Sequence, residues 1–121
     1  MTRIYLAAGL AFSMACAAPA SAQRAGMYDV TGTNPDGSAY TGTLELEQIG
    51  LLSFRLRWTI GPDVIEGVGM VSGLSFATAF SLGAGTSPSM GVYELRQNGQ
   101  LVGQWTTIGA FAAGQETATP R

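Results

Sequence analysis

The sequence predicts an all-β fold, a small eight-stranded antiparallel up-and-down barrel, and three observations lead to it. Apolar and polar residues alternate in short runs along most of the chain after residue 22, as in strands with one buried face. The 17 glycines are spread along the sequence, which suits tight turns and strongly bent strands. No stretch after residue 22 has the spacing of an amphipathic helix. A meander of eight strands can pair its last strand with its first, which removes both exposed edges.

Residues 1–22 are predicted to be a signal peptide that precedes the fold. Arg3 is followed by an apolar run over residues 4–15, and the segment ends on Ala20-Ser21-Ala22, a small-x-small pattern that signal peptidase accepts. The run is too short for a permanent anchor, and no stretch of about 20 apolar residues follows it. We therefore expect no transmembrane span.

An exported protein follows from this segment, either periplasmic or secreted, with one barrel domain over residues 23–121. Lipid attachment at Cys16, the only cysteine, is the less favoured alternative, because the usual leucine three positions upstream is missing. If cleavage falls after Ala22, the mature chain has no cysteine, so its core and its sheet closure must hold it together without disulfides.

The clearest pair of strands lies within residues 39–60, on either side of Gly50. The first strand places Glu45 and Glu47 on its polar face, and the second places Arg55 and Arg57 on its own. Pairing Glu47 with Arg55, and therefore Glu45 with Arg57, aligns the apolar faces of both strands. A one-residue slip would break both patterns together, so the register is a firm expectation.

Turn signals separate the other strands. Asn34-Pro35-Asp36-Gly37 and Asn98-Gly99 combine the residues that favour tight turns and hairpins. The expected strands are Met27–Thr33, Tyr40–Glu47, Phe54–Ile60, Val64–Val71, Leu74–Ser81, Met90–Arg96, Gln100–Thr107 and Phe111–Thr117, with Ala118–Arg121 as a frayed tail. Bending at the barrel wall is expected at Gly42, Gly67, Gly69, Gly91 and Gly103. The same pattern permits a flattened two-sheet sandwich as the alternative architecture.

Composition excludes most kinds of chemistry. No histidine, lysine or cysteine follows residue 22, so no catalytic triad and no imidazole or thiolate metal site can form there, and we expect no cofactor. Five arginines against eight acidic residues give that part a net charge of −3 without a basic run, which argues against nucleic acid as a partner. An enzyme using carboxylates alone would need inward-facing acids, and the alternation places Glu45, Glu47 and Glu94 outward. Only Glu66 has no clear orientation.

Aromatic residues dominate the expected inward positions. They are either a filled core or the lining of a cavity for a small apolar ligand, since an eight-stranded barrel can do both. The candidate cavity-lining residues are Tyr40, Phe54, Trp58, Tyr93 and Trp105. A macromolecular partner is expected to contact the loop at residues 83–89 together with Tyr28 and the exposed strand faces.

Several motifs extend over nearly all of the chain after residue 22. They are Tyr28-x-Val30-x-Gly32-x-Asn34-Pro35-Asp36-Gly37-Ser38-x-Tyr40-x-Gly42, Trp58-x-Ile60-Gly61, Gly67-x-Gly69 and Gly99-x-Leu101-x-Gly103-x-Trp105. On these residues the chain resembles a family of short exported proteobacterial proteins often labelled fibronectin-binding protein. The plan is also similar in outline to avidin-like and lipocalin-like barrels.

The resemblance implies an exported, non-enzymatic binding module that contacts a protein or extracellular-matrix partner. The alternative is a small-molecule carrier with an apolar barrel cavity. A carboxylate-only enzyme is the third hypothesis.

Overall fold

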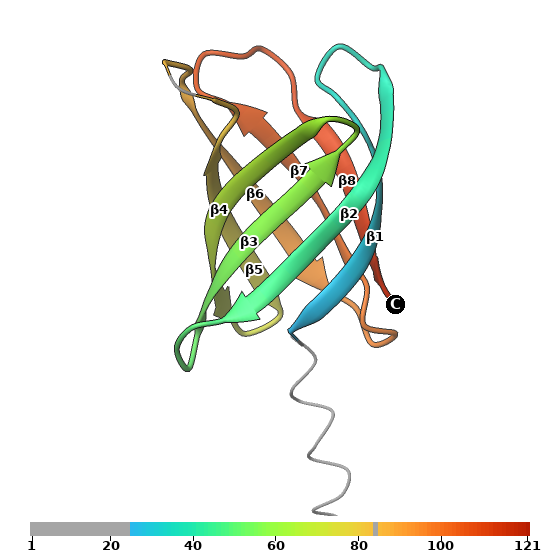
Figure 1. Cartoon of the computed structure of the whole chain (residues 1–121), viewed down its shortest axis with the longest axis vertical. Helices are drawn as coiled ribbons and strands as arrows, with labels where there is room; N and C mark the ends of the chain where they lie inside the picture. The colour runs from blue at the N-terminus through green and yellow to red at the C-terminus, as the bar shows by residue number, and fades with distance from the viewer. Residues whose placement is uncertain (1–24, 84) are drawn as a thin grey trace, which may run out of the picture.

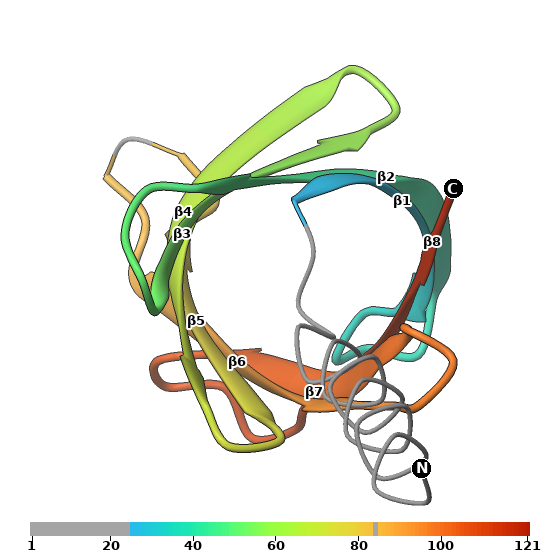
Figure 2. The ribbon, with the colours of Figure 1, turned by 90° about the horizontal axis from the view of Figure 1, so that it is seen from below.

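The structure, a computed structural model, describes residues 25–83 and 85–121 and is a closed barrel of eight antiparallel strands (Figure 1). The strands are β1 (Gly26–Thr33), β2 (Ala39–Gln48), β3 (Ser53–Ile60), β4 (Asp63–Ser72), β5 (Ser75–Ser81), β6 (Pro88–Leu95), β7 (Leu101–Thr107) and β8 (Gly114–Pro120). Each strand pairs with the next, and β8 pairs with β1, so the end-on view shows a closed ring (Figure 2). This confirms the predicted all-β up-and-down barrel over the two-sheet sandwich. The predicted signal peptide lies outside the described residues.

The expected register between the two charged strands is confirmed. Glu47 lies opposite Arg55 and Glu45 lies opposite Arg57 across the β2–β3 pair. Arg55 Nη1 lies 3.3 Å from Glu47 Oε1, and both side chains are exposed, so the pair contributes at most about 1 kcal/mol. Glu66 of β4 lies next to Arg57 in the register and is also exposed, so it points outward.

The end of the chain differs from the expectation. The eighth strand is Gly114–Pro120 instead of Phe111–Thr117, and Phe111 lies fully exposed in the loop before it. Ala118, expected in a frayed tail, is 0% exposed because it lies opposite Val30 of β1 and Leu101 of β7. The strand is polar and short, so it lacks an apolar signal of its own. Its neighbours on both sides define it, through the ladder hydrogen bonds that close the barrel.

Apolar side chains fill the end of the barrel that carries the β2–β3 and β6–β7 turns. Phe54 and Phe76 pack edge to face there, with ring centroids 5.6 Å apart. Tyr28 is only 2% exposed and belongs to this core, so its expected place in an outer contact surface was wrong. The buried apolar residues are Tyr28, Val30, Leu44, Leu46, Phe54, Leu56, Trp58, Phe76, Tyr93, Leu95, Leu101 and Ala118.

Glycines serve the barrel in two different ways. Gly37, in the β1–β2 turn, has a φ of 91°, a conformation that other residues rarely adopt. Gly103 has no such φ, but a Cβ there would overlap the carbonyl oxygen of Val92 on the neighbouring strand. The glycine expected to bend the wall at position 103 therefore provides room for close strand approach. No helix in the described part of the chain is long and apolar enough to cross a membrane.

Candidate functional site

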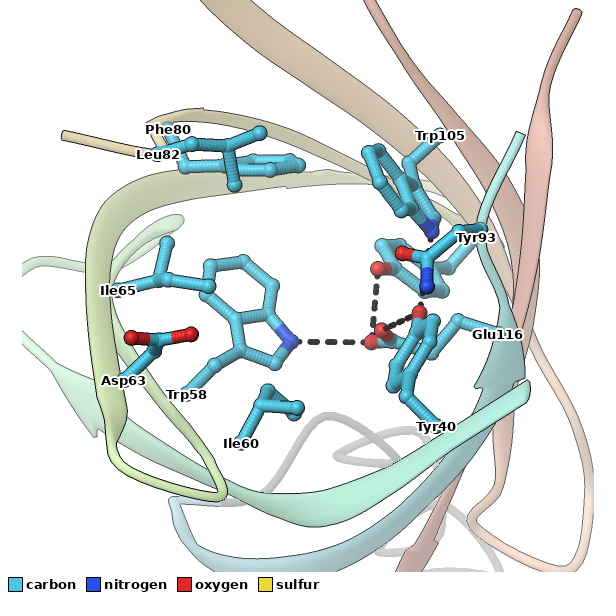
Figure 3. Close-up of a pocket in the computed structure, with 11 residues that line it drawn as sticks. Tyr40, Trp58, Ile60, Asp63, Ile65, Phe80, Leu82, Tyr93, Trp105 and Glu116 are labelled. Carbon is cyan, nitrogen blue, oxygen red and sulfur yellow. Dashed lines mark hydrogen bonds between the residues drawn. The ribbon is translucent and has the colours of Figure 1, made fainter. Parts of the chain in front are cut away.

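A cavity of about 320 Å³ opens at the opposite end of the barrel from the filled core (Figure 3). Inward side chains of β2 to β8 form its wall, and the turns after β1 and β5 contribute to its mouth. Its lining residues are Asn34, Tyr40, Trp58, Ile60, Asp63, Ile65, Phe80, Leu82, Tyr93, Trp105 and Glu116. The interior is therefore divided, with one half packed and the other hollow.

Four of the five residues expected to line a cavity lie together here. Tyr40, Trp58, Tyr93 and Trp105 come from four different strands and meet at the hollow end. The exception is Phe54, which does not line the cavity. It lies near the β2–β3 turn, is 3% exposed and packs on Phe76 in the filled half. Alternation predicts which face a residue occupies, but it does not predict the height at which a barrel stops being filled.

Glu116 of β8 is the central polar group of the site. It is 5% exposed, and its two carboxylate oxygens accept three hydrogen bonds. The Tyr40 hydroxyl donates to Oε1 at 2.6 Å. Trp58 Nε1 donates to Oε2 at 3.0 Å, and the Tyr93 hydroxyl donates to the same oxygen at 2.9 Å. A buried carboxylate is tolerated when its oxygens are satisfied in this way.

The network extends one step further, to Trp105. Its Nε1 donates to the Tyr40 hydroxyl oxygen at 3.0 Å, so Tyr40 accepts one hydrogen bond and donates another (Figure 3). Burial raises the pKa of Tyr40 above its ordinary value, and the charge of Glu116 and the hydrogen bond to it raise this pKa further. The pKa of Tyr93 is raised for the same reasons, burial first. Both phenols therefore remain protonated donors at neutral pH.

Aromatic rings form a continuous arc around the same carboxylate. Ring centroids lie 6.5 Å apart for Tyr40 and Trp105, 5.9 Å apart for Trp105 and Phe80, and 5.0 Å apart for Phe80 and Trp58. Since Trp58 and Tyr40 both donate to Glu116, the carboxylate closes the arc into a ring of five residues. We call these five residues, Tyr40, Trp58, Phe80, Trp105 and Glu116, the aromatic cage.

The cavity mouth has a second carboxylate and a fixed turn. Asp63, the first residue of β4, lines the cavity on the wall opposite Glu116 (Figure 3). Asn34 begins the β1–β2 turn, where Asp36 Oδ1 accepts hydrogen bonds from the backbone N–H and the hydroxyl of Ser38, which lower the pKa of Asp36. Among the described residues, no three histidine, cysteine, aspartate or glutamate side chains cluster in a way that could hold a metal ion.

The sequence reasoning missed Glu116. The signal was present in the closing strand, where Gly114, Glu116 and Ala118 alternate with polar residues that face outward. Small residues on either side of an acid at period two fit an inward face that is already crowded by its neighbours. Glu116, the one buried acid of the described residues, was not identified from the sequence because the eighth strand was predicted to be weak and to end before Ala118.

No protein-family model and no curated protein matches this chain. Solved structures of designed barrels are similar to it. A redesigned beta barrel has a TM-score of 0.71 and 18% identity, covering 85% of this chain and 95% of that one. A redesigned beta barrel bound to DFHBI has a TM-score of 0.66 and 19% identity, with 84% and 99% covered. A de novo designed fluorescence-activating beta barrel has a TM-score of 0.64 and 15% identity, with 84% and 98% covered.

At these identities, the similarity shows the shared fold of a small closed barrel. None of these structures bears on the resemblance to fibronectin-binding proteins, which stays a prediction.

Proposed function

We propose that the protein is a non-enzymatic binding module that holds a small molecule in the hollow half of its barrel. One observation carries this proposal, the cavity of about 320 Å³ lined by aromatic rings around a few convergent polar groups. Ligand pockets have this composition and occupy about 300–1,000 Å³, so the ligand is small. The carrier hypothesis therefore moves ahead of the protein-binding hypothesis that the sequence favoured.

The state of Glu116 supports a binding role over a catalytic one. Its oxygens already accept three hydrogen bonds from Tyr40, Trp58 and Tyr93, so they are poorly placed to take a proton from a substrate. The second acid, Asp63, lies on the opposite wall of the cavity. The hydrogen-bonded Glu116 therefore serves to hold a ligand in place, and it offers that ligand no free base.

Similar designed barrels lend further support. One of them is described as bound to DFHBI and another as fluorescence-activating. Closed barrels of this size can therefore be built to hold a small ligand, which makes the cavity a reasonable site in this chain.

Export remains part of the proposal, on the strength of the first 22 residues. The intact mass of the protein recovered from the envelope fraction of an expressing bacterium tests it. We expect a chain that begins at Gln23. A mass that retains residues 1–22 would contradict export through this segment, and an added lipid mass at Cys16 would favour the lipoprotein alternative.

The binding site is tested with N-phenyl-1-naphthylamine, a neutral aromatic compound whose fluorescence rises in apolar surroundings. We expect saturable binding to the native protein and its loss in Ile65→Phe, which places a larger side chain in the cavity. Val64→Phe is the matched control, because Val64 is the neighbouring residue on β4 and is 51% exposed. Equal binding by both variants, or no binding by the native protein, would contradict the proposed site.

A second candidate function rests on a different surface. Six apolar residues form an outer patch on β4, β5 and β6, in two rows across the three strands. Val68, Met70, Met90 and Val92 are 60%, 54%, 45% and 52% exposed. The rows are Val68, Ala79 and Met90, and Met70, Ala77 and Val92. Contiguous exposed apolar patches mark contact surfaces more often than scattered apolar residues do.

We assign this outer patch to the protein or matrix partner implied by the family resemblance, with fibronectin as the partner to test. Immobilised fibronectin should bind the native protein, and Val68→Lys with Val92→Lys should abolish binding. The control is Ile65→Phe, which changes the cavity and leaves the outer patch intact. Undiminished binding by the double lysine variant, or none by the native protein, would contradict this second function.

A further inference from the structure

Every side-chain hydrogen-bond donor of the aromatic cage already donates to an acceptor within the protein. The N–H groups of Trp58 and Trp105 and the O–H group of Tyr40 donate to one another or to Glu116, and Tyr93 donates to Glu116 as well. What the site still offers a ligand is lone pairs on the phenol oxygens, the carboxylate and the π faces of the rings. These groups attract a ligand that is positively charged or that donates hydrogen bonds.

The charge of the site is unbalanced in the same direction. Two acids, Glu116 and Asp63, line the cavity, and none of the arginines in the described part of the chain does. The ion pairs of the described chain lie elsewhere, at Arg55, Arg96 and Arg121, and their side chains are at least half exposed. In a poorly hydrated site, an unpaired carboxylate attracts a cation more strongly than it would in water.

The rings add a second attraction for positive charge. A cation within about 6 Å of a Trp, Tyr or Phe centroid is stabilised by the negative face of the ring, and cages of such rings bind quaternary ammonium ligands. In this protein Tyr40, Trp105, Phe80 and Trp58 follow one another around the cavity with centroid separations of 5.0–6.5 Å. The carboxylate of Glu116 completes the cage between Trp58 and Tyr40.

Resting on the function proposed above, we propose that the ligand is an organic cation whose alkylated ammonium head lies within the aromatic cage. An alkylated head fits better than a primary amine, because it needs no hydrogen bond. Glu116 already accepts three of them and has little capacity left. Its charge acts on the cation without a direct hydrogen bond, and the rings contact the alkyl groups.

Asp63 narrows the source of the cation. A lipid headgroup carries a phosphate beside its ammonium, and this phosphate would lie near the carboxylate at the mouth of the cavity. Like charges repel, so the site favours a free ammonium compound over a zwitterionic headgroup.

The experiment compares two compounds of the same shape. Choline carries the ammonium head, and 3,3-dimethyl-1-butanol replaces its nitrogen by carbon and is neutral. Binding is followed by the fluorescence of Trp58 and Trp105 and by calorimetry, with phosphocholine as the headgroup probe. We expect choline to bind at least tenfold more tightly than the neutral compound and more tightly than phosphocholine.

Variants test whether the aromatic cage causes the preference for choline. Glu116→Gln keeps the size of the side chain and removes its charge, so it should weaken choline binding at least tenfold and leave the neutral compound unchanged. The matched control is Glu94→Gln, which removes an exposed charge on the outer wall and should change neither. Circular dichroism of both variants establishes that they are folded.

The outcomes separate this inference from the proposed function. Binding of 3,3-dimethyl-1-butanol as tight as that of choline would overturn the cation proposal while leaving a small-molecule site. Equal choline binding by Glu116→Gln would overturn the role of the carboxylate. Phosphocholine binding tighter than choline would overturn the assignment to a free ammonium compound. If none of these compounds binds and N-phenyl-1-naphthylamine does not bind either, both the cation and the cavity function are wrong.

Discussion

Replacing Glu116 by leucine should destabilise the fold, even though it puts an apolar residue into an apolar barrel. The substitution leaves three donors without their acceptor. Trp58 and Tyr93 are 4% and 3% exposed, so their N–H and O–H groups have little access to water, whereas Tyr40 is only partly buried and can turn to water. Each unsatisfied buried donor costs about 1–3 kcal/mol, which gives about 2–6 kcal/mol for two.

Part of this loss is offset, because leucine avoids the cost of burying a carboxylate. We therefore expect the free energy of unfolding to fall by about 2–4 kcal/mol. Glu116→Gln should change it by no more than about 1 kcal/mol, because the amide oxygen can still accept from Trp58 and Tyr93. The Tyr40 hydroxyl can then rotate to accept from the amide nitrogen.

Urea unfolding followed by circular dichroism measures these differences, provided that the slope against urea concentration stays unchanged. A double-mutant cycle with Tyr93→Phe tests the cause. In the native background this change removes a hydrogen bond and should cost about 1 kcal/mol. In the Glu116→Leu background it removes an unsatisfied donor and should restore stability. A Glu116→Leu variant as stable as the native protein, or additive effects in the cycle, would refute this account of the network.

Four further predictions concern the barrel around the site. Gly103→Ala should cost about 3 kcal/mol of unfolding free energy in urea, because its Cβ meets backbone, whereas Gly50→Ala meets only the end of a serine side chain and should cost less than about 1 kcal/mol; equal losses would contradict the close-approach argument. The buried hydroxyl of Thr78 has no hydrogen-bond partner in the described chain, so Thr78→Val should raise the free energy of unfolding by about 1 kcal/mol and should raise the thermal midpoint with it. A lower midpoint would reveal a hydrogen-bond partner of Thr78. The unfolded chain loses the Tyr93 proton near pH 10, whereas the folded protein keeps it because the pKa of Tyr93 is raised there. The contribution of Tyr93 to the free energy of unfolding is therefore fully present below about pH 10 and is lost as the pH rises further. In Tyr93→Phe the fall of unfolding free energy above pH 10 should be shallower by about 1.4 kcal/mol per pH unit, and an unchanged slope would contradict the raised pKa. Deleting residues 118–121 should abolish the cooperative unfolding transition seen by circular dichroism, because it removes three of the six β1–β8 pairs and the buried Ala118, which also pairs with Leu101 of β7. A transition at the native midpoint would contradict the role of this end of β8 in closing the barrel.

Alternation along the strands predicted the barrel, with a two-sheet sandwich as the alternative, and it predicted most of the residues in the barrel wall. The pairing of Glu47 with Arg55 could be derived because two independent patterns, charge and apolar face, had to agree in one register. Four of the five expected lining residues face the cavity for the same reason. Alternation assigns each side chain to a face, and a closed barrel has only one inside.

The missing parts are those that depend on contacts between distant strands. Phe54 has the same pattern as Trp58, and only the packing of Phe76 against it shows that it belongs to the filled half. Glu116 sits on a strand that has almost no apolar residue of its own. Its burial follows from closure of the ring by β1 and β7, and its partners lie on β2, β3 and β6, between 23 and 76 positions away in the chain. The alternation within β8 indicates only that Glu116 faces inward, and nothing local to that strand indicates which residues donate hydrogen bonds to it.

The position of Glu116 is also an argument about function. Most inward positions of this barrel are apolar or glycine, and an apolar residue at 116 would line the interior without a buried charge. The chain instead holds a carboxylate where burial is costly, and devotes three donors from three strands to it. Because those donors belong to the protein itself, the carboxylate is held in place by the fold. A ligand of the kind proposed would not have to reorganise the site, so the electrostatic attraction of the site would be retained as affinity. Departures from the simplest packing are expected at functional sites, and here the departure, the ring arc and the hollow half of the barrel coincide.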